Sequence, residues 1–242
     1  VSKANSSVDY AMLEYCIRED LKLKKARMMA VLDPVKLVID NYPEGQSEEL
    51  VCPNHPQKPE MGTRTVTMSR ELWIEQEDFA EVPPKGYRRL TIPADGSPAK
   101  PVRLRNSYVI VPTSFEKDAE GNVVCVHADY LPETKSGTAG ADSVKTKAAI
   151  HWLDAKTAVP AQFRMYDRLF TVPQPDSAED FLTVLNRDSK FVSQGFVEPN
   201  VAAAAPETRY QFERIGYFVT DIKDHSAEHP VLNLAVGLRD SW

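Results

Sequence analysis

The chain has 242 residues, enough to bury a sizeable core as one large domain or two smaller ones. Its net charge of −6 excludes a globally basic nucleic-acid-binding protein, so any nucleic acid must be held by a local patch. No apolar run is long enough to span a bilayer, and three widely spaced cysteines are typical of reduced thiols, so we expect a cytoplasmic protein with no membrane partner.

The first predicted element is a helix from Ser6 to about Leu23. Ser6 and Asp9 have the spacing of a capping box, and an apolar stripe follows along one helix face: Val8, Met12, Leu13, Cys16 and Ile17. An amphipathic helix at the start of an otherwise β-rich chain has to pack its apolar face. We therefore expect a neighbouring element that lies outside this sequence.

From Arg27 onward the pattern changes to short strands separated by Pro, Gly and Asp turns. The 18 prolines lie between short apolar runs, which argues against long helices. A short helix is expected from Ser177 to Leu185, because Ser177 and Asp180 have capping spacing. Strands are expected near residues 28–41, with a break at Asp33-Pro34, and near 64–69, 72–75, 102–111, 123–131, 148–153, 161–172, 191–198, 209–222 and 231–238. This number of short strands predicts an all-β fold, most simply two β-barrels.

The densest positive charge lies between residues 85 and 105, which contain six cations and one acid: Lys85, Arg88, Arg89, Lys100, Arg103, Arg105 and Asp95. In the second half of this stretch Arg103 and Arg105 alternate with apolar residues, as on one face of a strand. Arginines so arranged suit bidentate recognition of phosphates or base edges. The alternative is a solvated edge strand whose exposed arginines only discourage aggregation.

Residues that could carry catalysis are scarce. Cys52 with His55, and His225 with His229, have ligand-like spacing, but neither pair has a partner cluster in the sequence. We interpret them as loop residues with ordinary hydrogen bonds and predict no metal site. No Gly-rich phosphate loop and no Gly-x-Ser-x-Gly elbow is present, so we predict no catalytic residue. Residues 136–142 (SGTAGAD) form the most flexible-looking connection, either a domain boundary or a long hairpin tip.

Seven segments carry a family resemblance: 28–41 (MMAVLDPVKLVIDN), 54–64 (NHPQKPEMGTR), 87–90, 102–111, 166–170 (YDRLF), 194–199 (QGFVEP) and 237–242 (GLRDSW). In this order they resemble the C-terminal, anticodon-binding half of bacterial glutaminyl-tRNA synthetase, a class I aminoacyl-tRNA synthetase. The resemblance covers essentially the whole chain. It implies two antiparallel β-barrels, over 27–140 and 141–242, that can exchange strands. Residues 1–26 would end the helical subdomain leading to the catalytic core.

The resemblance also implies which residues read bases. Arg27 and Gln211 would read the central uridine of the anticodon, with Arg214 near them, whereas Arg89 would read the third base and Arg103 the first. Arginine can donate two bonds to guanine, and glutamine offers a donor and an acceptor to a uracil edge. Gln211 and Arg214 would lie on opposite faces of an ideal strand, so we expect a bulge or twist between them.

Arg88 and Arg105 are expected to contact phosphates, which position RNA without specifying its sequence. The predicted partner is therefore the anticodon loop of a glutamine-accepting tRNA, and not DNA. Because the HIGH-type and KMSKS-type signatures of class I enzymes are absent from the sequence, this fragment should have no ligase activity and bind no cofactor. The parent ligase, expected to be a monomer, would use ATP and Mg²⁺. Two alternatives are a standalone rRNA-binding β-barrel and a β-sandwich interaction domain with merely superficial arginines.

Overall fold

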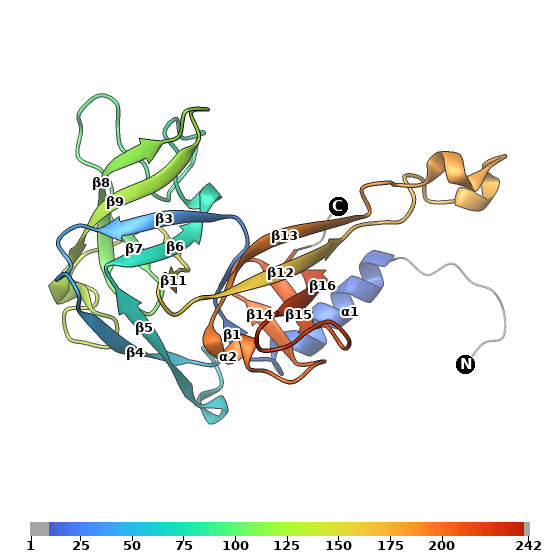
Figure 1. Cartoon of the computed structure of the whole chain (residues 1–242), viewed down its shortest axis with the longest axis horizontal. Helices are drawn as coiled ribbons and strands as arrows, with labels where there is room; N and C mark the ends of the chain where they lie inside the picture. Colours follow the sequence, from blue (N-terminus) through green and yellow to red (C-terminus); the bar gives the residue numbers. More distant parts are fainter. Residues whose placement is uncertain (1–9, 240–242) are drawn as a thin grey trace.

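The structure is a computed structural model that describes residues 10–239, and most of it is built from two seven-stranded sheets that lie side by side (Figure 1). The first sheet has the strand order β10-β7-β8-β9-β3-β6-β11. Its strands are β3 (Pro34–Ile39), β6 (Glu71–Glu75), β7 (Val102–Leu104), β8 (Val109–Lys117), β9 (Val123–Leu131), β10 (Ala149–Ile150) and β11 (Leu153–Asp154). A two-stranded ribbon, β4 (Ser47–Pro53) with β5 (Thr63–Ser69), accompanies it.

The second sheet has the order β1-β14-β15-β16-β12-β13-β2. Its strands are β1 (Arg27–Met28), β2 (Ala30–Val31), β12 (Val159–Tyr166), β13 (Lys190–Val197), β14 (Arg209–Phe212), β15 (Gly216–Thr220) and β16 (Val231–Gly237). Two α-helices are described, α1 (Tyr10–Lys22) and the single turn α2 (Pro199–Ala202). These two barrel-like sheets confirm the prediction of an all-β fold with a short N-terminal helix.

Strands are exchanged between the two sheets. β1 and β2 come first in the chain but pair within the second sheet, where Arg27 lies opposite Gln211 and Val31 opposite Phe196. In the other direction, residues 149–154 pair with β7 and β6 of the first sheet. The exchange places residues that are far apart in sequence at the junction of the sheets.

The chain crosses from the second sheet to the first between β2 and β3, and Glu75 fixes that crossing. Its carboxylate accepts hydrogen bonds from the backbone amides of Leu32 and Asp33 at 2.9 and 3.0 Å. Pro34 then begins β3, a position at which the missing proline N–H is tolerated. The break predicted at Asp33-Pro34 is confirmed, and its structural role is to change sheets.

A buried ion pair also holds the junction. Arg64 of β5 and Glu198, which precedes α2, have side chains that are 6% and 2% exposed, with Arg64 Nε 2.5 Å from Glu198 Oε2. The other oxygen of Glu198 accepts a hydrogen bond from the Met29 amide at 2.6 Å. Trp73 of the first sheet stacks on Phe196 of the second, with ring centroids 4.9 Å apart. Separating the sheets would break these contacts and leave a buried charge without its partner, which is costly. The ion pair and the stacked rings therefore hold the two sheets together.

Each sheet has its own core. Leu37, Met68 and Trp152 are among the fully buried residues of the first, whereas three rings, those of Phe163, Phe212 and Phe218, meet in the second. The alternating burial of β3 and β7 follows from side chains pointing to opposite faces along a strand.

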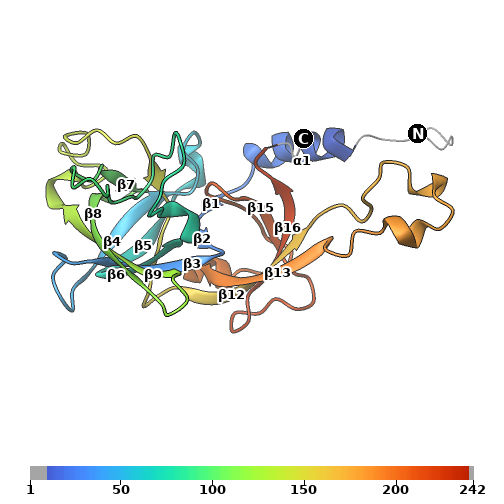
Figure 2. The ribbon, with the colours of Figure 1, turned by 90° about the horizontal axis from the view of Figure 1, so that it is seen from above.

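Several expected elements differ from the structure. The runs expected as single strands over 102–111 and 209–222 each form two antiparallel strands, β7 with β8 and β14 with β15, and β4 was not expected. The helix expected over 177–185 is wrong: two 3₁₀ turns, Pro175–Ser177 and Phe181–Val184, lie there, and the second is capped by Asp180, whose carboxylate accepts from the Leu182 amide at 2.9 Å. β12 ends at Tyr166 instead of near residue 172. These turns form the tip of the β12–β13 hairpin, which projects away from both sheets (Figure 2). The predicted Ser6 cap lies outside the described residues.

Helix α1 lies beside the second sheet, against β16 (Figure 2). Leu21 of the helix packs with Tyr217 and Val236 of the sheet, whereas Met12 and Leu13 on its first turns are exposed. Among residues 10–239, no helix has both the length and the apolar character needed to cross a bilayer.

Candidate nucleic-acid interface

Arg27 and Gln211 lie side by side at an edge of the second sheet. β1 is the edge strand and runs parallel to β14, with Arg27 opposite Gln211 in the register. The backbone of this edge is held on both sides: the Gln211 amide donates to the Ala26 carbonyl at 3.0 Å, and the Arg27 amide donates to the Asn54 carbonyl at 2.7 Å. The two predicted readers of the central base are therefore brought together by strand pairing.

These two side chains have unused polar atoms. Gln211 is only 7% exposed, yet its Oε1 has no hydrogen-bond partner among the described residues, and the same is true of the buried Nε of Arg27. A buried donor or acceptor without a partner costs about 1–3 kcal/mol. A donor and an acceptor left unpaired on two residues that are neighbours in the strand register indicate a place prepared for a polar ligand.

Arg214 reaches the junction of the sheets through a left-handed turn. β14 ends at Phe212, and Arg214 has φ of 68° before β15 begins at Gly216. A non-glycine residue in this region is uncommon and marks a constrained position. The turn takes the place of the expected bulge or twist: the chain leaves the strand before Arg214, so strand alternation no longer sets the direction of its side chain.

Asp78 joins arginines from the two sheets. It is fully buried, and its carboxylate accepts bonds from Arg214 Nη1 at 3.0 Å and Nη2 at 2.5 Å. Arg89 Nε lies 3.4 Å from the same carboxylate, and Arg89 Nη1 lies 2.9 Å from Glu77. Burial is the largest influence on the pKa of Asp78 and raises it, while the bond from Arg214 opposes the rise. Sequence reasoning missed this acid, because no motif marks it.

Arg103 is committed to the protein itself. Its guanidinium donates to four acceptors: the carbonyl oxygens of Ser107, Thr134 and Ala141 and the hydroxyl of Ser136. The interpretation of Arg103 as an exposed strand residue is wrong, because its side chain is half-buried in β7 and the segment after β9 folds over it. The connection 136–142 is thus held by an arginine. The assignment of Arg103 to the first anticodon base stays a prediction.

The two predicted phosphate contacts differ from each other. Arg105 follows β7, and its Nε lies 3.1 Å from Oε1 of Glu213, a residue of the second sheet's β14–β15 turn that is 8% exposed. Arg88 is exposed, and its side chain has no hydrogen bond or ion pair with any residue in the described range 10–239. Arg88 can meet a phosphate without breaking a contact, whereas Arg105 has to share its charge with Glu213.

The histidines considered as metal ligands have hydrogen-bonding roles. His55 Nε2 lies 2.9 Å from the Lys22 carbonyl, and its Nδ1 accepts from the Gln57 amide at 3.1 Å. His225 has the same kind of contacts: its Nε2 lies 3.1 Å from the Ala204 carbonyl, and its Nδ1 accepts from the Val231 amide at 3.2 Å. These contacts confirm the interpretation of His55 and His225 as hydrogen-bonded loop residues, but the same interpretation of Cys52 is wrong, because Cys52 is a buried residue of strand β4. The backbone partners of the two histidines leave no ring nitrogen of either residue free for a metal.

Comparison with known families agrees with this geometry. Residues 26–131 match the family described as the anticodon-binding domain of class I tRNA synthetases (E and Q), and residues 149–221 match a second family of the same description. The chain therefore belongs to the class I tRNA synthetase anticodon-binding domains. The matches run from β1 through β9 and from β10 through β15, and so include every predicted RNA-contacting residue.

Glutamine–tRNA ligases are among the curated proteins similar to this chain. The chain is 56% identical to the glutamine–tRNA ligase of Cupriavidus necator, 53% to that of Ralstonia nicotianae and 51% to that of Vibrio parahaemolyticus. Each alignment covers all of this chain but only 40% to 42% of the relative. The chain thus spans about two fifths of the length of the curated relatives it matches.

Proposed function

We propose that this chain reads the anticodon of a glutamine tRNA as the C-terminal module of a glutamine–tRNA ligase. The observation that carries the proposal is that Arg27 and Gln211, neighbours in the strand register, each have a buried polar atom without a hydrogen-bond partner, a donor on Arg27 and an acceptor on Gln211. Family membership and the identity to glutamine–tRNA ligases support it. In the whole ligase, ATP and Mg²⁺ would bind outside this chain, and this chain alone would not attach glutamine to tRNA.

The unused atoms complement a uracil edge. Uracil presents an N–H donor flanked by two carbonyl acceptors, so Gln211 Oε1 can accept from the base while Arg27 Nε donates to an adjacent carbonyl. Cytosine presents an acceptor at the ring position where uracil has its N–H, so in the same pose Gln211 Oε1 would face another acceptor instead of a donor. Because unpaired buried acceptors are costly, the pair should prefer uridine at the centre of the anticodon.

The cluster around Asp78 would read the neighbouring base. Arg89 uses Nε and Nη1 on Asp78 and Glu77, but no described residue accepts a bond from its Nη2, and the side chain is 33% exposed. Arg89 can therefore donate to the third base while Asp78 holds it in place. Arg214, whose Nη1 and Nη2 both donate to Asp78, would orient this group beside the central base.

Arg88 and Arg105 would contact phosphates on either side of the bases that are read. Arg103 would reach the first base only by releasing part of the 132–143 segment, so its reading role depends on that rearrangement. The proposal thus ranks the residues by their available atoms: Arg27 and Gln211 first, Arg89 next, and Arg103 last.

The direct test is binding of the purified chain to anticodon stem-loops of a glutamine tRNA. We expect tighter binding when the central base is uridine than when it is cytidine, by about tenfold or more, which is the discrimination one polar contact to a base provides. A ribosomal RNA stem of the same length is the control. Equal affinity for all central bases, or tighter binding of the ribosomal stem, would contradict the proposal and favour the rRNA-binding alternative.

A further inference from the structure

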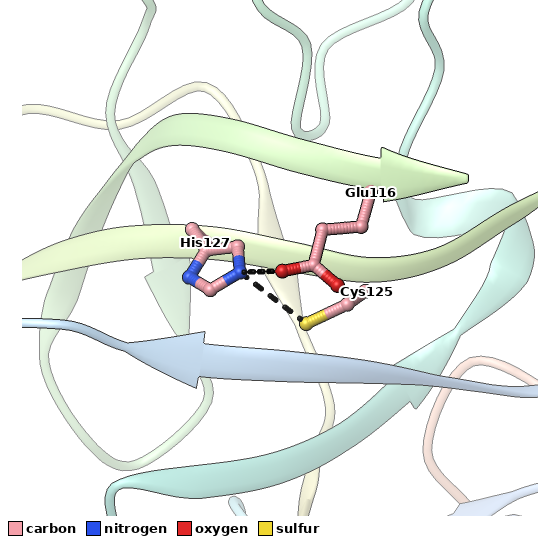
Figure 3. Close-up of side chains that lie close together, drawn as sticks. All are labelled: Glu116, Cys125 and His127. Carbon is pink, nitrogen blue, oxygen red and sulfur yellow. Dashed lines mark hydrogen bonds and ion pairs between the residues drawn. The ribbon is translucent and has the colours of Figure 1, made fainter. Parts of the chain in front are cut away.

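A separate group of side chains with metal-binding atoms lies on the first sheet, on the β8–β9 hairpin (Figure 3). Glu116 of β8 lies directly opposite Cys125 of β9, and His127 follows Cys125 by two residues, so all three project from the same face. His127 Nε2 is 3.1 Å from Glu116 Oε1 and 3.7 Å from Cys125 Sγ. The three donor atoms lie within 4.8 Å of one another.

We propose that Glu116, Cys125 and His127 bind one Zn²⁺ ion, with water as the fourth ligand. Thiolate, imidazole and carboxylate are the three side-chain ligand types that zinc takes. With the usual bond lengths, a tetrahedral zinc ion sets its nitrogen and oxygen ligands about 3.4 Å apart, and its nitrogen and sulfur ligands about 3.6 Å apart. The observed 3.1 and 3.7 Å are within 0.3 Å of those edges, and the remaining pair, the Glu116 oxygen and the Cys125 sulfur, lies within 4.8 Å.

Asp40 supplies the orientation that zinc-binding histidines usually have. Asp40 comes directly after β3, the strand that pairs with β9, and its Oδ1 lies 3.0 Å from His127 Nδ1. A metal-bound histidine commonly donates its other N–H to a carboxylate, which fixes the tautomer and the direction of the ring. With the proton on Nδ1 and donated to Asp40, the lone pair of His127 Nε2 points at Glu116 and Cys125.

A cation is needed between His127 and Glu116. In that tautomer both Nε2 and the carboxylate oxygen are acceptors, and two acceptors 3.1 Å apart repel unless a proton or a metal lies between them. Without metal, a proton takes this place. Zinc would replace that proton and the thiol proton of Cys125.

The surroundings allow an ion. Cys125 is 8% exposed and Glu116 is exposed, so the site opens to solvent on the carboxylate side, where a water ligand can enter. Lys36 lies opposite Cys125 on β3, but its ammonium is 3.0 Å from the Glu71 carboxylate, which offsets its charge. None of the three ligands belongs to the RNA interface, and the inference does not rest on the proposed function.

The test is Zn²⁺ binding by the whole chain, measured by competition with a chromophoric zinc indicator. We expect one equivalent to bind, and Cys125→Ser or His127→Gln to remove it. Asp40→Asn should weaken it by about 10- to 100-fold, the usual effect of losing the partner of a ligating histidine. Cys16→Ser is the control, because this exposed cysteine of α1 lies outside the site and should change nothing.

The absorption spectrum of bound Co²⁺ provides a second test, which reports directly on the thiolate ligand and so distinguishes its loss from a folding defect. Co²⁺ bound to the wild-type chain should give thiolate-to-cobalt charge-transfer absorption, which Cys125→Ser removes and the exposed-ligand variant Glu116→Gln weakens. Thermal melts of the metal-free variants check that they fold. Unchanged zinc affinity in Cys125→Ser and His127→Gln, or no stoichiometric zinc binding by the wild type, would overturn the proposal and leave His127 as a protonated bridge between two carboxylates.

Discussion

The two places where predicted RNA-contacting residues gather differ in how their hydrogen-bonding atoms are used. At the edge formed by β1 and β14, the Arg27 Nε and the Gln211 Oε1 are buried and unpaired. At the junction of the sheets, Arg214 and Arg89 are both held by the buried Asp78. At the strand edge, polar atoms are free to bond a ligand. At the junction of the sheets, the arginine atoms already bond to Asp78.

We expect the residues at the strand edge to recognise a base, and the acid at the junction of the sheets to hold the arginines in position. A base that donates to Gln211 Oε1 removes the free-energy cost of a buried, unpaired acceptor. No existing bond has to be broken, so the whole hydrogen bond contributes to binding. A base that displaced Asp78 from Arg214 would first break charge-assisted bonds worth about 1.5–3 kcal/mol each. We therefore infer that acids such as Asp78 aim the arginines, and that discrimination between bases comes from atoms the protein leaves unpaired.

The largest expected effect comes from Asp78→Ala. Two arginines from different sheets would lose their buried counter-charge, and the free energy of unfolding should fall by about 3 kcal/mol or more. Urea unfolding measures this, with Asp176→Asn, an exposed carboxyl of the β12–β13 tip, as the control. A loss as small as that of the control would mean that Asp78 does not hold the sheets together.

Arg103→Ala should have the next largest effect. Three hydrogen bonds to the segment after β9 and one to the Ser107 carbonyl are removed, and the free energy of unfolding should fall by about 2 kcal/mol, since bonds from a charged donor contribute more than neutral ones. The exposed Arg187→Ala is the matched charge control. If Arg103→Ala unfolds like that control but loses discrimination at the first anticodon base, Arg103 is a reader and its contacts to the segment are incidental.

Arg88→Ala should have the smallest effect. Removing one exposed cation should weaken binding to all stem-loops about equally and lower the slope of log affinity against log salt by roughly 0.7 to 0.9, as expected for one lost phosphate contact. Fold stability should not change, because the side chain is exposed and makes no hydrogen bond or ion pair with a described residue. A loss confined to one anticodon sequence would show instead that Arg88 reads a base.

The sequence was sufficient for the fold class, because Pro and Gly turns separate short alternating runs, although the hairpins β7–β8 and β14–β15 were each expected as one strand and β4 was missed. It was also sufficient for the break at Asp33-Pro34, where proline chemistry is local. Residue patterns alone could not show the exchange of β1 into the second sheet, for which only the family resemblance allowed, since pairing Arg27 with Gln211 joins residues 184 positions apart.

The site was predicted less completely for the same reason. Asp78 and Glu213 hold arginines of the opposite sheet, and nothing near them in sequence marks a buried acid at a junction. Arg103 alternates with buried residues as an exposed side chain would, yet the segment 132–143 covers it. Alternation predicts which face of a strand a residue occupies, but not what later parts of the chain place on that face.

The central claim is tested most directly by replacing the unpaired acceptor with an apolar side chain of similar shape, Gln211→Met. The measurement pairs urea unfolding with binding to stem-loops that carry uridine or cytidine at the central anticodon position. Because a buried acceptor without a partner is removed, the variant should be at least as stable as the wild type, while its preference for uridine should fall by about tenfold, or roughly 1.4 kcal/mol. A variant that is less stable and still prefers uridine to the same degree would show that Gln211 supports the fold and does not read the base.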